Sequence, residues 1–172
     1  GNAARKNWNS IGDHLPAYLV NLILSLDPLP TGEDAEHSSY LRSLLDRSVE
    51  VLEVTARLIL EKFPEEGSPY VNERFERDWR PVKDWGWQQD RAVVGHNLKI
   101  AWNLTRVANY YQAKGKNRDA ERLMVLCRRI GDTMATLGVD QIRSGVFDAV
   151  ERAAADKSIP VQLSWQNTKD FW

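Results

Sequence analysis

The hydrophobic positions along the chain recur mainly with the spacing of amphipathic helices. A first helix is expected over residues 14–26, because the prolines that follow cannot continue its hydrogen-bond ladder. A long helix is expected over residues 38–63, where the large aliphatic side chains share one face. Two more are expected over residues 93–113 and 118–137, with Gly138 as a left-handed C-cap of the last one. The pattern predicts an all-α protein.

Three segments depart from the helical pattern. Residues 70–87 alternate polar and apolar side chains around a proline, which predicts a short hairpin or an irregular excursion. Residues 146–151 are expected to form a short strand, and residues 159–165 an extended segment. Helix pairs separated by such long loops are typical of helical solenoids and α/α barrels.

Composition and charge narrow the class of partner. The 172 residues fit one domain and include 23 Lys and Arg against 24 Asp and Glu, a net charge of −1. Such a balance argues against nucleic acid or an anionic membrane as the main partner. The most apolar stretch, residues 15–26, is too short to span a bilayer, so a cytoplasmic location is expected. Cys127 is expected in the core, and no cluster of Cys and His suggests a metal or cofactor.

The residues richest in chemistry lie in the middle of the chain. His96 follows Gly95 at the start of a predicted helix, where an imidazole would sit at the rim of a pocket. Aromatic rings near a titratable group suit a pocket for a ring-shaped ligand. Four of the seven tryptophans fall in or just before this helix: Trp79, Trp85, Trp87 and Trp102.

On a helical projection, five polar residues of the predicted helix form one stripe: His96, Lys99, Asn103, Arg106 and Tyr110. This stripe would face either solvent or the lumen of a barrel, and apolar residues around the rest of the helix indicate that the helix is buried on two sides. Trp102 lies about 120° from His96 on an ideal helix. Its ring could therefore stack on a ligand or pack in the core.

The other two histidines are weaker candidates. His14 follows Asp13, a carboxylate that could orient the imidazole or cap the helix, and capping is the favoured interpretation. His37 falls in an acidic surface loop and is expected to have no specific role.

Several of these residues resemble a known family. Gly95, His96 and Trp102 match a Gly-His-x-x-Glu-x-x-Trp segment, and the stretch before it carries Phe75, Asp78, Trp79 and Pro81. The chain thereby resembles the N-acylglucosamine 2-epimerase superfamily, which includes the cellobiose 2-epimerases. The helix that begins near His14 is similar to an earlier His-x-x-Glu-Ala helix of that family, with Ala17 in place of the glutamate.

The resemblance implies a partial (α/α)6 barrel, built of antiparallel helix hairpins and formed by the middle and later part of the family fold. Because the chain begins at Gly1 and stops after a polar aromatic segment, it is expected to be cut at both ends. The implied reaction is proton transfer at the carbon next to the open-chain carbonyl of an aldose or N-acylhexosamine, without a cofactor. His96 would be the acid/base, and the implied sugar contacts are His14, Trp102, Trp165 and Trp172.

The chain also departs from the family pattern. Lys99 stands where the family has glutamate, which predicts a lowered pKa for His96 and an imidazolium without a carboxylate partner. No histidine follows His96, although the family uses a second one near its C-terminus, so this segment alone is expected to be inactive. Three functions stay open: a sugar epimerase or isomerase, a carbohydrate-binding protein without catalysis, and a helical protein-interaction scaffold. A half-barrel with exposed helix faces is also expected to form homodimers or to aggregate.

Overall fold

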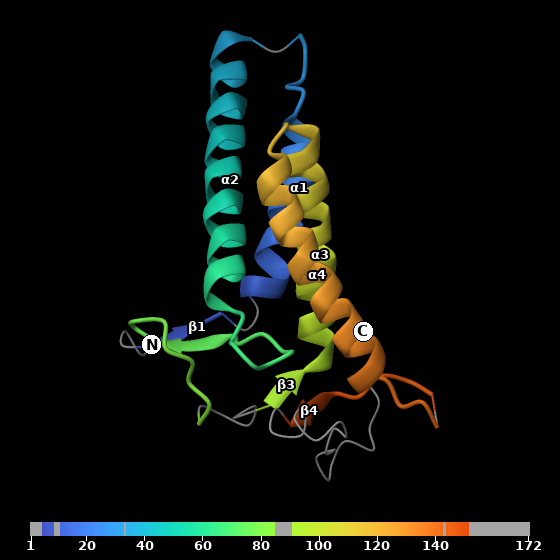
Figure 1. The fold of residues 1–172 in the computed structure, drawn as a ribbon. Helices are drawn as coiled ribbons and strands as arrows, with labels where there is room; N and C mark the ends of the chain where they lie inside the picture. Colours follow the sequence, from blue (N-terminus) through green and yellow to red (C-terminus); the bar gives the residue numbers. More distant parts are fainter. Residues whose placement is uncertain (1–4, 9–10, 33, 85–90, 143, 152–172) are drawn as a thin grey trace.

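The computed structural model describes residues 5–8, 11–32, 34–84, 91–142 and 144–151, and it is mostly α-helical (Figure 1). Within these residues the chain forms four long helices and two small antiparallel sheets of two strands each. The prediction of a helical protein with short strands in its loops is confirmed. None of the described helices is both long and apolar enough to cross a membrane.

The first helix, α1, spans Ile11–Leu26 and begins three residues before the predicted start. The helix begins early because the backbone N–H groups of Ile11 and Gly12 donate hydrogen bonds to the carbonyl of Trp8, which precedes them in the chain. This extra turn places Asp13 inside the helix, fully buried. The expectation that Asp13 caps the helix was therefore wrong.

The second helix, α2, spans Ala35–Lys62 and runs back along α1 (Figure 1). Asp34 caps it, since its side chain accepts a hydrogen bond of 2.8 Å from the backbone N–H of His37. The cap starts the helix three residues before the predicted Ser38 and places His37 in its first turn.

The second hairpin consists of α3, Val94–Ala113, and α4, Asn117–Leu137. Gly115 turns the chain between them with a φ of +76°, a conformation that glycine adopts without strain. Gly138 ends α4 with a φ of −87°, so the predicted left-handed cap was wrong. A glycine fits there for another reason: a β carbon would lie 2.6 Å from Cγ1 of Val94.

The strands join segments that are far apart in the sequence. Strand β1, Arg5–Asn7, pairs with β2, Arg74–Glu76, while β3, Arg91–Val93, pairs with β4, Ala149–Glu151. The excursion over residues 70–87 is thus not a self-contained hairpin, although Phe75 and Pro81 form one bridge within it. The strand expected over residues 146–151 is confirmed as β4, and the expected extended segment at 159–165 lies outside the described residues.

The core lies where α1 packs on α2 and α3 and where α3 packs on α4. Cys127 is buried in it, as predicted. By contrast, α2 and α4 barely touch and are separated by an open groove. Both sheets lie at the end of the helices where α2 finishes and α3 begins (Figure 1). That end of the molecule carries the polar residues discussed next.

Candidate active site

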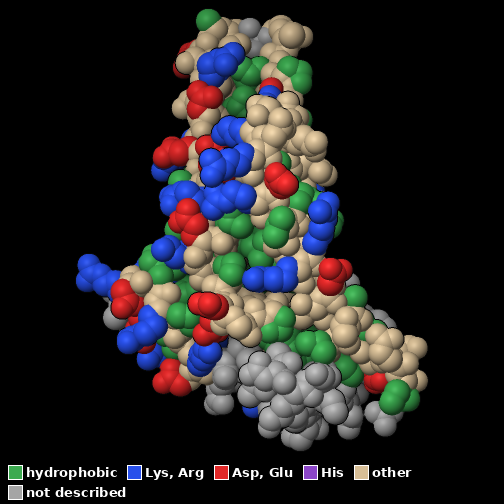
Figure 2. Space-filling view, in the orientation of Figure 1, with side chains coloured by type: hydrophobic (Ala, Val, Ile, Leu, Met, Phe, Trp, Pro, Cys, Tyr) green, Lys and Arg blue, Asp and Glu red, His purple; other side chains and the backbone are tan. Residues whose placement is uncertain are grey.

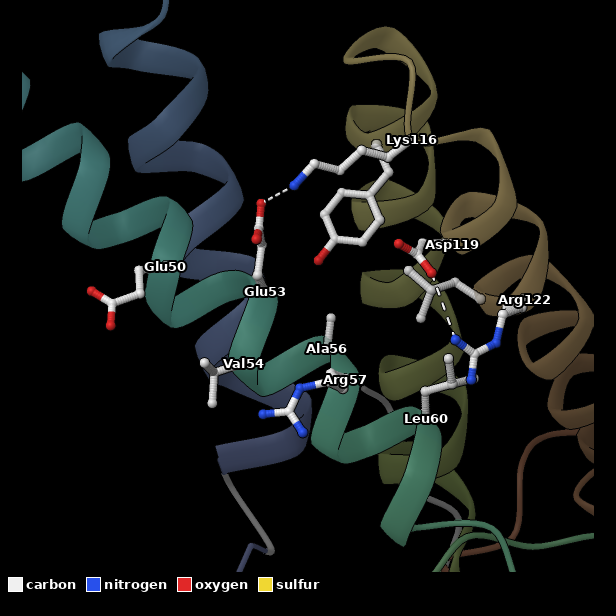
Figure 3. Close-up of a pocket in the computed structure, with 11 residues that line it drawn as sticks. Glu50, Glu53, Val54, Ala56, Arg57, Leu60, Lys116, Asp119 and Arg122 are labelled. Atoms are coloured by element: carbon white, nitrogen blue, oxygen red, sulfur yellow. Dashed lines mark hydrogen bonds and ion pairs between the residues drawn. The ribbon is translucent and has the colours of Figure 1, made fainter.

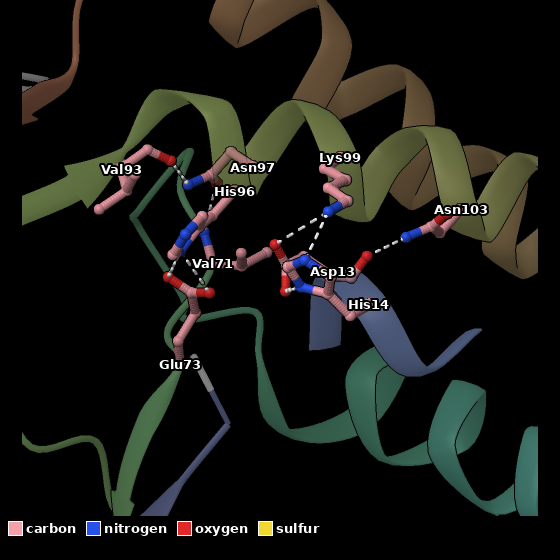
Figure 4. A network of polar contacts seen from close by, with 9 residues as sticks. All are labelled: Asp13, His14, Val71, Glu73, Val93, His96, Asn97, Lys99 and Asn103. Atoms are coloured by element: carbon pink, nitrogen blue, oxygen red, sulfur yellow. Dashed lines mark hydrogen bonds and ion pairs between the residues drawn. The ribbon is translucent and has the colours of Figure 1, made fainter. Parts of the chain in front are cut away.

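A buried carboxylate and imidazole form the first part of a polar network (Figure 4). The two carboxylate oxygens of Glu73 lie 3.1 and 3.2 Å from Nδ1 of His96, and each residue is only 9% exposed. Since a carboxylate only accepts, Nδ1–H is the donor and the basic lone pair of the neutral ring lies on Nε2. His96 is in the first turn of α3 as predicted, but it is more enclosed than a residue at a pocket rim.

Asn97 ties the segment that carries Glu73 to the start of α3. Its Oδ1 accepts a hydrogen bond of 3.2 Å from the backbone N–H of Val71, and its Nδ2 donates to the carbonyl of Val93 at 2.9 Å. Asn97 is fully buried, and Glu73 directly precedes β2. The side chain of Asn97 therefore joins the backbone two residues before Glu73 to the first turn of α3, which carries His96.

The pKa of His96 depends on its burial and on the charged groups around it. Burial alone would lower it, but the hydrogen bond and the charge of Glu73, with a contribution from Asp13, outweigh burial and raise the pKa above its ordinary value. The charge of Lys99 lowers the pKa but is outweighed by Glu73, so the predicted lowering of the pKa of His96 was wrong. The expectation that imidazolium would lack a carboxylate partner was wrong, because Glu73 supplies one.

A second chain of contacts joins α1 to α3. His14 Nδ1 lies 2.7 Å from Oδ1 of the buried Asp13, and Nζ of Lys99 lies 2.9 Å from His14 Nε2 (Figure 4). Lys99 Nζ is also 3.8 Å from Oδ2 of Asp13. With Nδ1–H donating and Nε2 accepting, the His14 ring is a neutral tautomer. Asp13 thus orients the imidazole, the alternative that the sequence analysis had ranked second.

Three residues of the polar stripe on α3, Lys99, Asn103 and Arg106, contact α1. Besides the contact between Lys99 and His14, Asn103 donates to the backbone carbonyl of Asp13, and Arg106 Nη2 donates to Oδ1 of Asn21 at 2.5 Å. Lys99 and His14, like Arg106 and Asn21, are separated by 85 residues. Because the sequence separation is the same at both contacts, residue numbers increase in the same direction along the two helices, so α1 and α3 are parallel and in register. His96 and Asn103 are buried, so this stripe is not a solvated face.

The aromatic residues fall into two groups. Trp102 is 55% exposed, so it does not pack in the core, and the Arg106 guanidinium lies 5.1 Å from its ring centroid. Trp79 instead belongs to an aromatic cluster with Trp8 and Phe75, at centroid distances of 5.6 and 5.3 Å. Four tryptophans of the sequence analysis lie outside the described residues: Trp85, Trp87, Trp165 and Trp172.

A separate groove of about 280 Å³ lies between α2 and α4 (Figure 3). Apolar and charged side chains both line it, and among the charged ones Lys116 pairs with Glu53 and Arg122 with Asp119. Basic side chains stand out over this region in the space-filling view (Figure 2). The residues of the polar network do not line this groove, which we therefore treat as a distinct feature.

Sequence reasoning missed Glu73, which lies 23 residues before its partner in an irregular segment. A carboxylate shortly before a strand was the only local signal. No three His, Cys, Asp or Glu among the described residues are grouped to hold a metal ion. Comparison with protein-family models gave no match, and a search of curated proteins gave none either. The function must therefore be proposed from the site itself.

Proposed function

We propose that this chain carries a carbohydrate site that transfers a proton at the carbon next to the open-chain carbonyl of an aldose or N-acylhexosamine, with His96 as the base. The observation that carries the proposal is the buried pair of Glu73 and His96, in which the carboxylate holds Nδ1 of the ring. A histidine oriented in this way needs little further adjustment to act as a base near neutral pH.

The reaction follows from the tautomer that Glu73 selects. Nε2 of the neutral ring takes the proton from carbon 2, and the electrons of the broken C–H bond form a double bond between carbons 1 and 2. The carbonyl oxygen becomes an enediolate oxygen, and imidazolium forms beside Glu73, whose charge stabilises it. Return of the proton to carbon 2 gives exchange or epimerisation. With an aldose, return of the proton to carbon 1, together with transfer of the 2-hydroxyl proton to the oxygen on carbon 1, gives the ketose.

Lys99 supplies the positive charge that an enediolate needs. Its Nζ is held by His14 and by the buried Asp13, and its charge acts on His96. A fixed ammonium that donates to the developing oxyanion stabilises the transition state more than the substrate. Lys99 in place of a glutamate is then compatible with the reaction, because Glu73 provides the carboxylate for His96.

The fold supports the same proposal. In an α/α barrel the inner helices of successive hairpins run parallel and face a lumen. Here α1 and α3 run parallel in register, and α2 and α4 flank them (Figure 1). We interpret the two hairpins as consecutive units of a partial (α/α)6 barrel. The exposed rings of Tyr18 and Trp102 would then face the lumen and contact the sugar.

The test is hydrogen exchange at carbon 2, followed by proton NMR in deuterated water with the natural full-length protein. A panel of aldoses and N-acylhexosamines serves as substrate. Exchange should be abolished by His96→Asn and strongly reduced by Glu73→Gln and Lys99→Met. His37→Asn is the matched control, since His37 is exposed on α2, and it should leave the rate unchanged.

Two outcomes would contradict the proposal. Exchange that survives in His96→Asn would remove His96 from the reaction. A protein that binds a sugar without exchanging carbon 2 would be a carbohydrate-binding protein, the second of the three functions left open by the sequence.

A further inference from the structure

We propose that Arg106, with Trp102 and Asn21, binds the carboxylate of an acidic sugar, so that the substrate of the proposed reaction is a disaccharide ending in a uronic acid. This inference rests on the proposed function and adds the class of substrate. It concerns the part of the face between α1 and α3 that lies farther along α3 from His96.

Arg106 is held in one orientation by neutral groups. Its Nη2 donates to Asn21 Oδ1 at 2.5 Å, and its guanidinium lies over the Trp102 ring at 5.1 Å. A guanidinium that is stacked on one face keeps its other N–H groups in a planar fork, the geometry that matches a carboxylate. Within the described residues, Arg106 forms no ion pair with Asp or Glu.

The cations nearby are compensated, which makes Arg106 unusual. Lys114 pairs with Asp27 and Lys116 with Glu53 at the far end of α3. The sequence of α3 contains no Asp or Glu, and the single carboxylate of α1, Asp13, is fully buried and engaged by Lys99. Among the described residues, this face therefore presents one positive charge without a neighbouring carboxylate, and the carboxylate of a ligand would neutralise it.

The distance between His96 and Arg106 suits a ligand with two sugar rings. His96 and Arg106 are ten residues apart, about 15 Å along a helix that rises 1.5 Å per residue. A single hexose is shorter than this, so the acidic group belongs to a second sugar unit. Trp102 lies between the two ends on α3, and Tyr18 lies on α1 between His14 and Asn21, which contact Lys99 and Arg106 of α3. Both rings have more than half of their surface exposed. Such rings suit the apolar faces of sugars.

The experiment compares two ligands that differ only in charge. Cellobiose and the acid obtained by oxidising carbon 6 of its non-reducing ring are titrated against the natural full-length protein, with tryptophan fluorescence and calorimetry as readouts. The acid should bind about tenfold tighter, the effect of one hydrogen-bonded ion pair. Arg106→Gln should remove this preference, so that the acid and cellobiose bind with similar affinities, while Arg106→Lys should retain part of it.

Arg57→Gln is the matched control, because Arg57 lies in the groove between α2 and α4, and it should keep the full preference. Equal affinity for the two ligands, or a preference that survives in Arg106→Gln, overturns the inference. Inorganic phosphate binding as tightly as the acid also overturns it, since the site would then recognise charge without sugar. Exchange at carbon 2 is measured separately. If the protein exchanges carbon 2 of neutral sugars but binds the acid no more tightly than cellobiose, only this inference is contradicted. If it prefers the acid but exchanges no sugar, only the proposed function is contradicted.

Discussion

Gly12 lies directly against the ring of Phe63: a β carbon at residue 12 would approach Cε2 of Phe63 to 2.6 Å. The ring cannot move away easily, because it is fully buried and contacts Trp8 and Phe75 at centroid distances of 5.9 and 5.5 Å. This contact packs the first turn of α1 on the end of α2 and so places Asp13.

Gly12→Ala should therefore destabilise the protein by about 1–3 kcal/mol, the usual cost of overpacking a core. Urea unfolding followed by circular dichroism measures the change. Gly131→Ala is the control, since a β carbon there meets nothing within 4 Å in the middle of α4. That variant should be neutral or stabilised by up to about 1 kcal/mol. Equal unfolding midpoints for the two variants would show that the Phe63 ring moves aside to accommodate the added methyl group.

The pair of Glu73 and His96 should make stability depend on pH. Because the folded pKa of His96 is raised, its contribution is fully present below the unfolded pKa of about 6.5 and is lost as pH rises through the folded pKa. Glu73→Gln should cost about 1–3 kcal/mol at about pH 5.5 and less at higher pH. Thermal unfolding across this range checks the trend. A cost that grows toward alkaline pH would contradict the assigned direction.

The same substitution should change the pH dependence of carbon 2 exchange. His96 must be neutral to accept a proton, so the rate should rise as pH passes through its raised pKa. In Glu73→Gln, the imidazolium loses its partner and the rise should move to lower pH, with a smaller maximum rate. A rise at the same pH in both proteins would mean that another group controls the reaction.

Asn97→Leu should destabilise the protein by about 1–3 kcal/mol, because the backbone groups of Val71 and Val93 would lose their buried partner. The same variant should slow exchange by shifting Glu73 relative to His96. Asn109→Leu, at an exposed position of the same helix, should change stability by no more than about 0.5 kcal/mol. Chemical unfolding of both variants makes the comparison.

Cys127 should react slowly with thiol reagents in the native state. Its side chain is 5% exposed, and burial raises its pKa, so little reactive thiolate is accessible. Ellman's reagent should modify it at a rate that increases sharply with urea across the unfolding transition. Rapid modification without denaturant would show that α4 opens from the core.

The helices could be predicted because their hydrophobic spacing is local, and all four were located to within three residues at each end. The strands were harder to predict. Strand β1 pairs with a segment about 70 residues away, and the residues Arg5–Asn7 give no indication of that partner. Gly138 was misjudged because glycine serves two purposes, a left-handed turn and close packing, and a sequence does not distinguish them.

The candidate site was predicted only in part. His96 and His14 stood out as imidazoles, a side chain common in acid/base sites, and the structure brings both into polar contacts with carboxylates. Glu73 could not be assigned because its partner His96 lies 23 residues away in a different element, and a local alternation of polar and apolar residues does not show which distant side chain a carboxylate meets. For Asp13, capping and orienting the imidazole both require a carboxylate beside the helix start, and only the position of Trp8 decides between them.

The parallel docking of α1 on α3 also has a consequence for how the protein folds. Within each helix hairpin the contacts join neighbours along the chain, whereas the contacts of Lys99 with His14 and of Arg106 with Asn21 each close a loop of 85 residues. Loops of this length form late, so the site should assemble only after both hairpins exist. A ligand that touches α1 and α3 together would then slow their separation, and the amide hydrogens of both helices would exchange with solvent as one cooperative unit.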